Sequence, residues 1–215
     1  MRGSIATKIT NLGWQLLKRP DYLWRYVSTI PARGVSPIEL GLPWISFAAI
    51  DFLSKWVSPG HRVFEWGCGG STAFFANRAS RVVSLEHDPE WYSRVKIMLK
   101  ERLLANVDLR LAVFEAGNAV NFENTEYLSA VREDSWDLIL VDGVLGYGSG
   151  GDFGTHRQVC FSHAEKQIRA GGVIIVDDIW MFPEIQKSNR AKCWREYIGV
   201  GPCRFGVTST AAFFY

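Results

Sequence analysis

The chain has 215 residues, 47% of them hydrophobic, and can therefore bury one core of ordinary size. Basic residues outnumber acidic residues by only two and form no block, which argues against a nucleic-acid partner and favours a small molecule. No apolar run is long enough to span a bilayer, and the N-terminus lacks the pattern of a signal peptide. We therefore expect a soluble, cytoplasmic protein with no integral membrane segment.

The first 45 residues are predicted to form a helical extension or cap ahead of a domain that covers residues 46–215. A second helical segment starts at Pro20, and the whole stretch is basic and contains Trp14 and Trp24. Its first helix has four apolar residues on one face, Ile5, Ile9, Leu12 and Leu16. Two uses stay open: a cap or lid on the domain, or a contact surface for a second copy (a homodimer) or for a membrane.

Five runs rich in valine, isoleucine and leucine follow, each of strand length. They cover residues 62–66, 81–86, 107–114, 136–142 and 172–178. Several are apolar throughout, which is typical of parallel strands with helices on both faces. Helical patterns lie between them, at residues 71–79, 89–104, 125–133 and 156–170. This alternation predicts an α/β fold, a Rossmann-like three-layer sandwich with a mostly parallel seven-stranded sheet.

The last two strands of that sheet are expected from residues 202–215, which have a β-type composition. A turn-like Thr-Ser-Thr stands in the middle of this segment, and no helical pattern separates its halves. We therefore predict a C-terminal antiparallel hairpin at the sheet edge.

The four cysteines have neither the CxxC nor the CxxH spacing of a zinc site, and they give no disulfide framework. They are Cys68, Cys160, Cys193 and Cys203. A reducing compartment fits this pattern.

A cluster of glycines follows the first predicted strand, in the stretch VFEWGCGGSTAFFA. In open α/β sheets the ligand binds outside the carboxyl ends of the strands, at such a turn. Gly67, Gly69 and Gly70 permit positive φ angles and a close approach of a ligand to the backbone, while Ser71 and Thr72 can cap the next helix.

Two carboxylates narrow the ligand class. Glu65 stands just before the first glycine, where it would repel a phosphate and favour a cationic ligand. Glu86 ends the next strand, the position from which this fold binds ribose hydroxyls. The pattern predicts a positively charged nucleoside without phosphate.

These residues resemble the class I S-adenosylmethionine-dependent methyltransferases, because EWGCG matches their acidic-x-Gly-x-Gly motif. The resemblance implies that Glu65 and the glycine turn hold the methionine end of the donor and that Glu86 takes the ribose hydroxyls. It also implies that His87 and the Gly117–Asn118 turn lie by the adenine. The implied cofactor-binding set is Glu65, Gly67, Cys68, Gly69, Gly70, Ser71, Glu86, His87, Gly117, Asn118 and Asp142. The alternative is that Glu65 only satisfies backbone amides of the turn.

Three aspartates end the fourth and fifth predicted strands, namely Asp142, Asp177 and Asp178. Three hard oxygen donors at one sheet edge suit Mg²⁺ or a similar cation. The arrangement resembles the metal-dependent O-methyltransferases of the catechol and macrocin types, which implies a metal site at these residues. Such a metal would lower the pKa of an acceptor hydroxyl. Alternatively, Asp142 orients the next loop and the Asp pair caps a helix.

The segment after Asp142, residues 143–158, is rich in glycine and is predicted to be a lid or substrate loop. Val144 departs from the sugar-modifying type, which has an acidic residue there, and Asp152 or His156 could take over its role. His156 is the candidate general base beside Asp142, the other candidate catalytic residue; a solvated loop histidine is the alternative. His163 is expected to be structural.

The fourth strand end also lacks the Asn-Pro-Pro-Tyr or Asp-Pro-Pro-Tyr sequence of methyltransferases that act on adenine or glutamine amines. Apolar residues follow the Asp pair and could wall an acceptor pocket together with Trp44, although core packing explains them equally well. These are Trp180, Met181 and Phe182.

The leading hypothesis is an S-adenosylmethionine-dependent O-methyltransferase that acts on a hydroxyl of a small molecule, such as a sugar or a phenolic compound, with help from a divalent metal ion. One rival is a metal-independent enzyme in which His156 or water takes the proton. A second is a non-catalytic S-adenosylmethionine-binding module. A third is a nicotinamide-dependent oxidoreductase, against which Glu65 argues.

Overall fold

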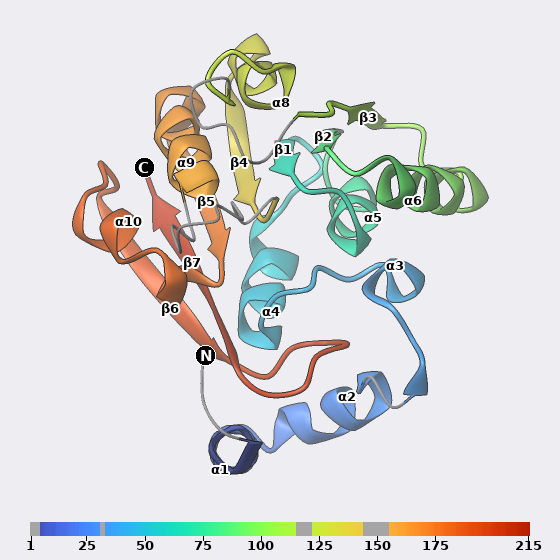
Figure 1. Cartoon of the computed structure of the whole chain (residues 1–215), viewed down its shortest axis with the longest axis vertical. Helices are drawn as coiled ribbons and strands as arrows, with labels where there is room; N and C mark the ends of the chain where they lie inside the picture. Colours follow the sequence, from blue (N-terminus) through green and yellow to red (C-terminus); the bar gives the residue numbers. More distant parts are fainter. Residues whose placement is uncertain (1–4, 31–32, 115–121, 144–154) are drawn as a thin grey trace.

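The computed structural model describes residues 5–30, 33–114, 122–143 and 155–215. Its centre is a seven-stranded sheet in the order β3-β2-β1-β4-β5-β7-β6 (Figure 1). The strands are β1 (Arg62–Trp66), β2 (Arg81–Glu86), β3 (Val107–Leu111), β4 (Trp136–Val141), β5 (Ile168–Asp177), β6 (Cys193–Gly199) and β7 (Thr208–Phe214). The first five are parallel, and β7 pairs antiparallel with both β5 and β6. The predicted fold class is confirmed.

Helices cover both faces of this sheet. The helices of the described residues are α1 (Ile5–Lys18), α2 (Asp21–Thr29), α3 (Pro37–Leu40), α4 (Phe47–Trp56), α5 (Gly70–Ala76), α6 (Pro89–Glu101), α8 (Glu126–Ser129), α9 (Thr155–Gln167) and α10 (Pro183–Lys187). Alternate strand residues belong to different cores: Leu138 and Leu140 pack with α4 and α5, whereas Ile139 and Val141 pack with α8 and α9. Apolar residues on both faces explain why these strands are hydrophobic throughout.

Helix α6 shows how local signals set the elements. Asp88 caps it by accepting a hydrogen bond from the Trp91 backbone N–H at 2.8 Å, and Pro89 occupies its first turn. The helix leads back along the sheet to β3, so β2 and β3 are joined by a parallel crossover. β2 also pairs in parallel with β1, with Leu85 opposite Trp66, so Glu86 at the end of β2 lies beside the end of β1.

The C-terminal hairpin differs from its prediction. Thr208, Ser209 and Thr210 do not turn; they lie inside β7 and are buried. The other arm is β6, upstream of the segment expected to contain both arms. The physical reason is that two of the hydroxyls find acceptors: Thr210 donates to Asp177 at 2.7 Å and Thr208 donates to Asp178 at 3.0 Å. Satisfied polar side chains can stand in a buried strand.

Three other boundaries also move. β3 ends at Leu111 rather than continuing to residue 114. The helical pattern at 125–133 becomes the short α8 followed by a 3-10 turn over Ala130–Glu133. α9 stops at Gln167, because the next residues already belong to the start of β5.

The N-terminal helices attach to the α4 side of the molecule. Tyr22 and Tyr26 of α2 are buried in the same cluster as Phe47, and the Tyr22 hydroxyl donates to Asp51 at 2.9 Å. α1 has no buried residue, and only part of it touches this cluster. The division into an extension over 1–45 and a domain over 46–215 stays a prediction. Among the helices of the described ranges, none is long and apolar enough to cross a membrane.

Candidate functional site

The glycines after β1 differ in what a side chain at each position would meet. Gly67 has a φ of +92°, and a Cβ there would lie 2.9 Å from the Asp142 carbonyl oxygen; a Cβ on Gly70 would lie 2.2 Å from the carbonyl oxygens of Pro37 and Leu42. Both positions are required by the protein's own backbone. At Gly69, by contrast, the nearest atom to such a Cβ is 3.9 Å away, on Trp91. Gly69 is therefore the glycine with room for a ligand.

Glu65 lies enclosed beneath this turn, with no exposed surface. Its Oε1 accepts hydrogen bonds from the hydroxyls of Thr72 and Ser84, the latter at 2.8 Å, and Oε2 has no hydrogen-bond partner among the described residues. Thr72 also accepts from the Gly69 N–H at 3.0 Å, so the carboxylate is linked to the turn. Burial raises the pKa of Glu65 to about 7. The group carries a proton more readily than an ordinary glutamate.

Glu86 joins the ends of β1 and β2. Its Oε2 accepts from the Cys68 N–H at 3.2 Å, and its Oε1 accepts from the N–H groups of His87 and Asp88 at 2.8 and 3.0 Å. Burial works to raise the pKa of Glu86, but the hydrogen bonds from His87 and Asp88 outweigh it, and the pKa lies below its usual value. This carboxylate is therefore ionised at neutral pH. Ser71 lies buried at the start of α5.

His156 lies among aromatic rings on the first turn of α9. Its ring centroid is 4.4 Å from that of Phe122, nearly perpendicular to it, and 5.8 Å from that of Phe114, which also packs against His87 at 5.6 Å. The side chain is 5% exposed, and neither ring nitrogen has a hydrogen-bond partner in the described structure. Burial lowers the pKa of His156. This apolar position does not support the prediction that His156 is a general base.

The three predicted aspartates do come together at the ends of β4 and β5. Asp142 has 22% of its side chain exposed, Asp178 has 23%, and Asp177 is enclosed. Burial raises the pKa of Asp142 to about 6. Burial and the charges of the other two aspartates raise the pKa of Asp177 well above its usual value. Asp178 stands in the left-handed region at a φ of +51°.

Arg157, which the sequence analysis did not single out, ties these strand ends together. Its buried guanidinium donates to the backbone carbonyls of Gly143, Asp177 and Asp142 at 2.9, 2.9 and 3.2 Å. It also lies 3.2 Å from Asp142 Oδ1. No motif surrounds this arginine, which reads in the sequence as one basic residue of a helix. Its role becomes visible in the described structure, where the first turn of α9 lies beside the ends of β4 and β5.

Arg204, also absent from the sequence prediction, approaches the aspartates from the connection between β6 and β7. It lies 3.6 Å from Asp177 Oδ2 and 3.7 Å from Asp178 Oδ1. Its guanidinium is stacked over the ring of Trp44, with 5.0 Å to the centroid. Trp44 keeps 48% of its surface exposed. Arg204 and Trp44 thus border the aspartates on their open side.

The three carboxylates do not fit the predicted divalent-metal site. The two arginines already lie 3.2, 3.6 and 3.7 Å from their oxygens, so a metal ion would meet two fixed positive charges. Within the described ranges, no group of three or more histidine, cysteine, aspartate or glutamate side chains is arranged to hold a metal. In the described structure these three aspartates are paired with arginines, and their role as metal ligands stays a prediction that this pairing disfavours.

Of the other residues singled out in the sequence, some lie in the core, some lie near the aspartates and some lie outside the described residues. Phe182 is fully buried and packs in the core, whereas the Trp180 indole donates to Asp178 at 3.1 Å. His163 is buried beside Arg132, with 3.1 Å between Nδ1 and Nη2, as expected for a structural residue. All four cysteines are free. Gly117, Asn118, Val144, Asp152 and most of the glycine-rich loop lie outside the described residues.

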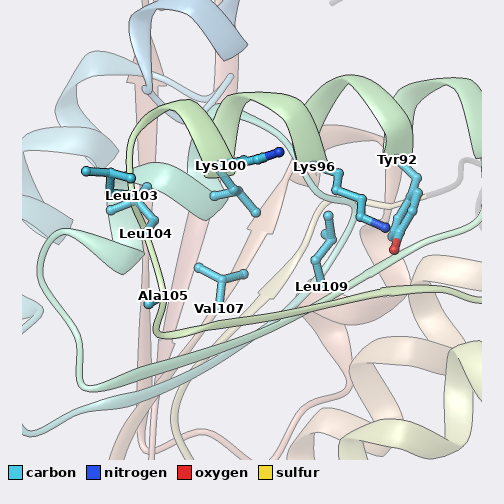
Figure 2. Close-up of a pocket in the computed structure, with 9 residues that line it drawn as sticks. Tyr92, Lys96, Lys100, Leu103, Leu104, Ala105, Val107 and Leu109 are labelled. Carbon is cyan, nitrogen blue, oxygen red and sulfur yellow. The ribbon is translucent and has the colours of Figure 1, made fainter.

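A separate pocket of about 520 Å³ lies between α6 and the edge strand β3 (Figure 2). Leu103, Val107 and Leu109 form its apolar part, and Lys96 and Lys100 project from the helix beside it. None of the predicted site residues lines it. We therefore do not assign it to the candidate active site.

Known proteins resemble this chain in structure but not in sequence. No family model matches it, and no curated protein matches it. An O-methyltransferase from Bacillus cereus in complex with S-adenosylhomocysteine (SAH) is 20% identical with a TM-score of 0.57, and the match covers 79% of this chain and 82% of that one. A Streptococcus mutans protein classed as a methyltransferase, also with SAH, is 12% identical with a TM-score of 0.56, covering 84% and 99%.

A third similar structure is an rRNA methylase from Streptococcus thermophilus, 14% identical with a TM-score of 0.55, covering 84% of this chain and 97% of that one. At such identities the likeness defines the fold: the chain has the class I S-adenosylmethionine-dependent methyltransferase fold. The acceptor differs among these proteins. The predicted absence of a nucleic-acid partner therefore stays a prediction.

Proposed function

We propose that the chain is an S-adenosylmethionine-dependent methyltransferase whose donor binds at the carboxyl ends of β1 and β2. The observation that carries the proposal is the pair of carboxylates there, Glu65 beneath the glycine turn and ionised Glu86 on the next strand, in a chain with this fold. The remaining lone pairs of Glu86 can accept hydrogen bonds from ribose hydroxyls. Two carboxylates suit a donor that carries an ammonium and a sulfonium and no phosphate.

The acceptor we propose is a hydroxyl of a small sugar or phenolic compound, held beside Asp142. This residue is next to the donor turn, because the backbones of Gly67 and Asp142 are in close contact. The hydroxyl oxygen attacks the methyl carbon in line as the carbon–sulfur bond breaks, and the electron pair of that bond stays on sulfur to give neutral SAH. The hydroxyl proton passes to the Asp142 carboxylate, whose pKa of about 6 makes it a stronger base than an ordinary aspartate while it stays largely ionised at neutral pH.

Trp44 supports the acceptor class. Its half-exposed ring, with Arg204 stacked on it, offers a flat surface against which a phenol ring or a sugar face can pack. The proposed reaction uses no metal ion, because Asp142 takes the proton and because Arg157 and Arg204 already lie beside the carboxylates that a metal ion would use. Two alternative functions would give different experimental results: a donor-binding module without turnover, and a nicotinamide-dependent enzyme.

The test is transfer of labelled methyl from S-adenosylmethionine to a panel of phenols, catechols and sugars, with and without EDTA. We expect turnover that EDTA does not change. Asp142→Asn should lower kcat about 100-fold and leave the affinity for SAH within about twofold, because a proton acceptor is lost and the donor site is kept. Asp108→Asn, the same change on the far edge strand β3, is the matched control and should leave kcat unchanged.

Two results would contradict this account. Abolition of turnover by EDTA would restore the metal-dependent mechanism, and full activity of Asp142→Asn would remove the proposed base. Donor binding with no transfer to any acceptor would instead favour the non-catalytic module.

A further inference from the structure

Exposed apolar side chains concentrate in the first two helices. Of the large hydrophobic residues that are exposed in the described structure, six lie within α1 and α2: Ile5, Ile9, Trp14, Leu17, Leu23 and Trp24. Leu17 and Trp24 are 76% and 79% exposed. Isolated exposed hydrophobic residues are ordinary, but a concentration of this kind marks a surface that contacts something else.

The two tryptophans point away from the protein body. Leu12 and Leu16 lie on the side of α1 that packs against the core cluster. Trp14 is two residues from each of them and therefore lies on the opposite side of the helix. Trp24 is related in the same way to the buried Tyr22 and Tyr26 of α2. In Figure 1 both helices lie at one end of the molecule, beyond α4. Trp14 and Trp24 are therefore not covered by the sheet edge at which the candidate site lies.

The positive charge of the protein gathers in the same segment. The first 29 residues hold five basic residues and one acidic residue, a net charge of +4, whereas the remaining 186 residues hold 19 basic and 21 acidic residues, a net charge of −2. α1 has no acidic residue, and the ammonium of Lys18 lies 5.1 Å from the Trp14 ring centroid. The only acid of the segment, Asp21, is paired with Arg19, and Arg25 is paired with Asp51 of α4. Among the described residues of α1 and α2, the charge offered to a partner therefore comes from Lys8 and Lys18.

We propose that α1 and α2 form a docking surface for an anionic lipid bilayer. Helices that lie in a membrane interface combine exposed leucine, isoleucine and tryptophan with lysine and arginine, and they span nothing. The attraction of basic groups to anionic headgroups supplies the electrostatic part. RNA would use the charges but has no use for the exposed aliphatic side chains of Ile5, Ile9 and Leu17. A second copy would bring the same net positive charge to the contact and be repelled.

The experiment is flotation of the full chain with vesicles of phosphatidylcholine, with and without phosphatidylglycerol. We expect binding to the anionic vesicles at least about tenfold stronger than to the neutral ones, and weaker at high salt. Leu17→Glu with Trp24→Glu should reduce anionic-vesicle binding to the neutral-vesicle level. Ile97→Glu with Leu103→Glu is the matched control and makes the same charge change. Ile97 lies in α6 and Leu103 follows the end of that helix, and they are 59% and 87% exposed.

Circular dichroism and the unfolding temperature verify that both double variants are folded. Equal binding of the wild-type chain to both kinds of vesicle would overturn the proposal, whatever the variants do. So would unchanged vesicle binding of Leu17→Glu with Trp24→Glu, or an equal loss in the control. Binding to structured RNA without vesicle binding would assign the surface to nucleic acid. A dimer in sedimentation equilibrium that the Leu17/Trp24 variant dissociates, without vesicle binding, would assign it to a second copy.

Discussion

Gly69 and Gly70 are neighbours in the glycine turn after β1, yet we expect opposite effects from the same substitution. Gly70→Ala should cost about 2 kcal/mol of unfolding free energy or more, because its Cβ would meet two carbonyl oxygens at 2.2 Å. Gly69→Ala should cost less than about 1 kcal/mol, since its φ of 170° is ordinary extended backbone, but should weaken SAH binding by occupying the open side of the turn. Urea unfolding and calorimetry measure the two effects. Equal stability of both variants would contradict the packing assigned to Gly70.

Glu65 should make the stability of the ligand-free protein depend on pH. Burial raises its pKa from 4.5 to about 7, so the folded chain keeps a proton that the unfolded chain releases between these values. The resulting stabilisation is complete below about pH 4.5 and is lost as the pH rises through 7. Glu65→Gln removes this loss and should be more stable than the wild type at pH 8, by up to about 3 kcal/mol.

Urea unfolding at pH 5 and pH 8 checks this prediction. Glu133→Gln, at a half-exposed side chain paired with Arg110, is the control and should keep the wild-type slope. A Glu65→Gln protein with the same pH slope as the wild type would show that Glu65 is ionised in the fold.

At the scale of elements, Arg157 links α9 to the ends of β4 and β5. Arg157→Met should destabilise the protein by about 3 kcal/mol, because it leaves buried carbonyls and Asp142 without their cationic donor. Arg169→Met is the control: its side chain is 44% exposed, makes one ion pair with Asp137, and should matter by less than about 0.5 kcal/mol. Chemical unfolding of both variants measures the two losses of unfolding free energy. Similar losses would mean that the strand ends hold together without Arg157.

The same strand ends separate what the sequence could predict from what it could not. β1 and β2 have their predicted bounds, because parallel strands covered on both faces are marked by continuous apolar runs. The Thr-Ser-Thr of β7 looked like a turn, because nothing local reveals that strand-end aspartates bind its hydroxyls. Arg157 and Arg204 could not be found for a similar reason. Their role depends on contacts between segments far apart in the chain.

For the candidate site, the sequence predicted the position of the glycine turn, because a motif there specifies the backbone conformation. The EWGCG motif located Glu65 and the turn, and the end of the next predicted strand located Glu86. The described structure joins Glu86 to the turn through the Cys68 N–H. The residue types at β4 and β5 suggested a metal, since three carboxylates at one edge have that chemistry. What pairs with a carboxylate is decided by the tertiary structure, and here it is arginine.

At the scale of the whole molecule, the proposed donor site lies at the sheet edge, and the basic, apolar surface lies on the N-terminal helices. The first rests on the fold and its two carboxylates, and the second on exposure and charge. They lie on different elements, so the vesicle experiment and the methyl-transfer experiment can fail independently. The central claim is the identity of the donor.

The most direct measurement of that claim is titration calorimetry of the wild-type chain with SAH and, separately, with NAD⁺. We expect one SAH to bind per chain and NAD⁺ not to bind, because the pyrophosphate of NAD⁺ would approach Glu65 and Glu86. Binding of NAD⁺ without binding of SAH would contradict it.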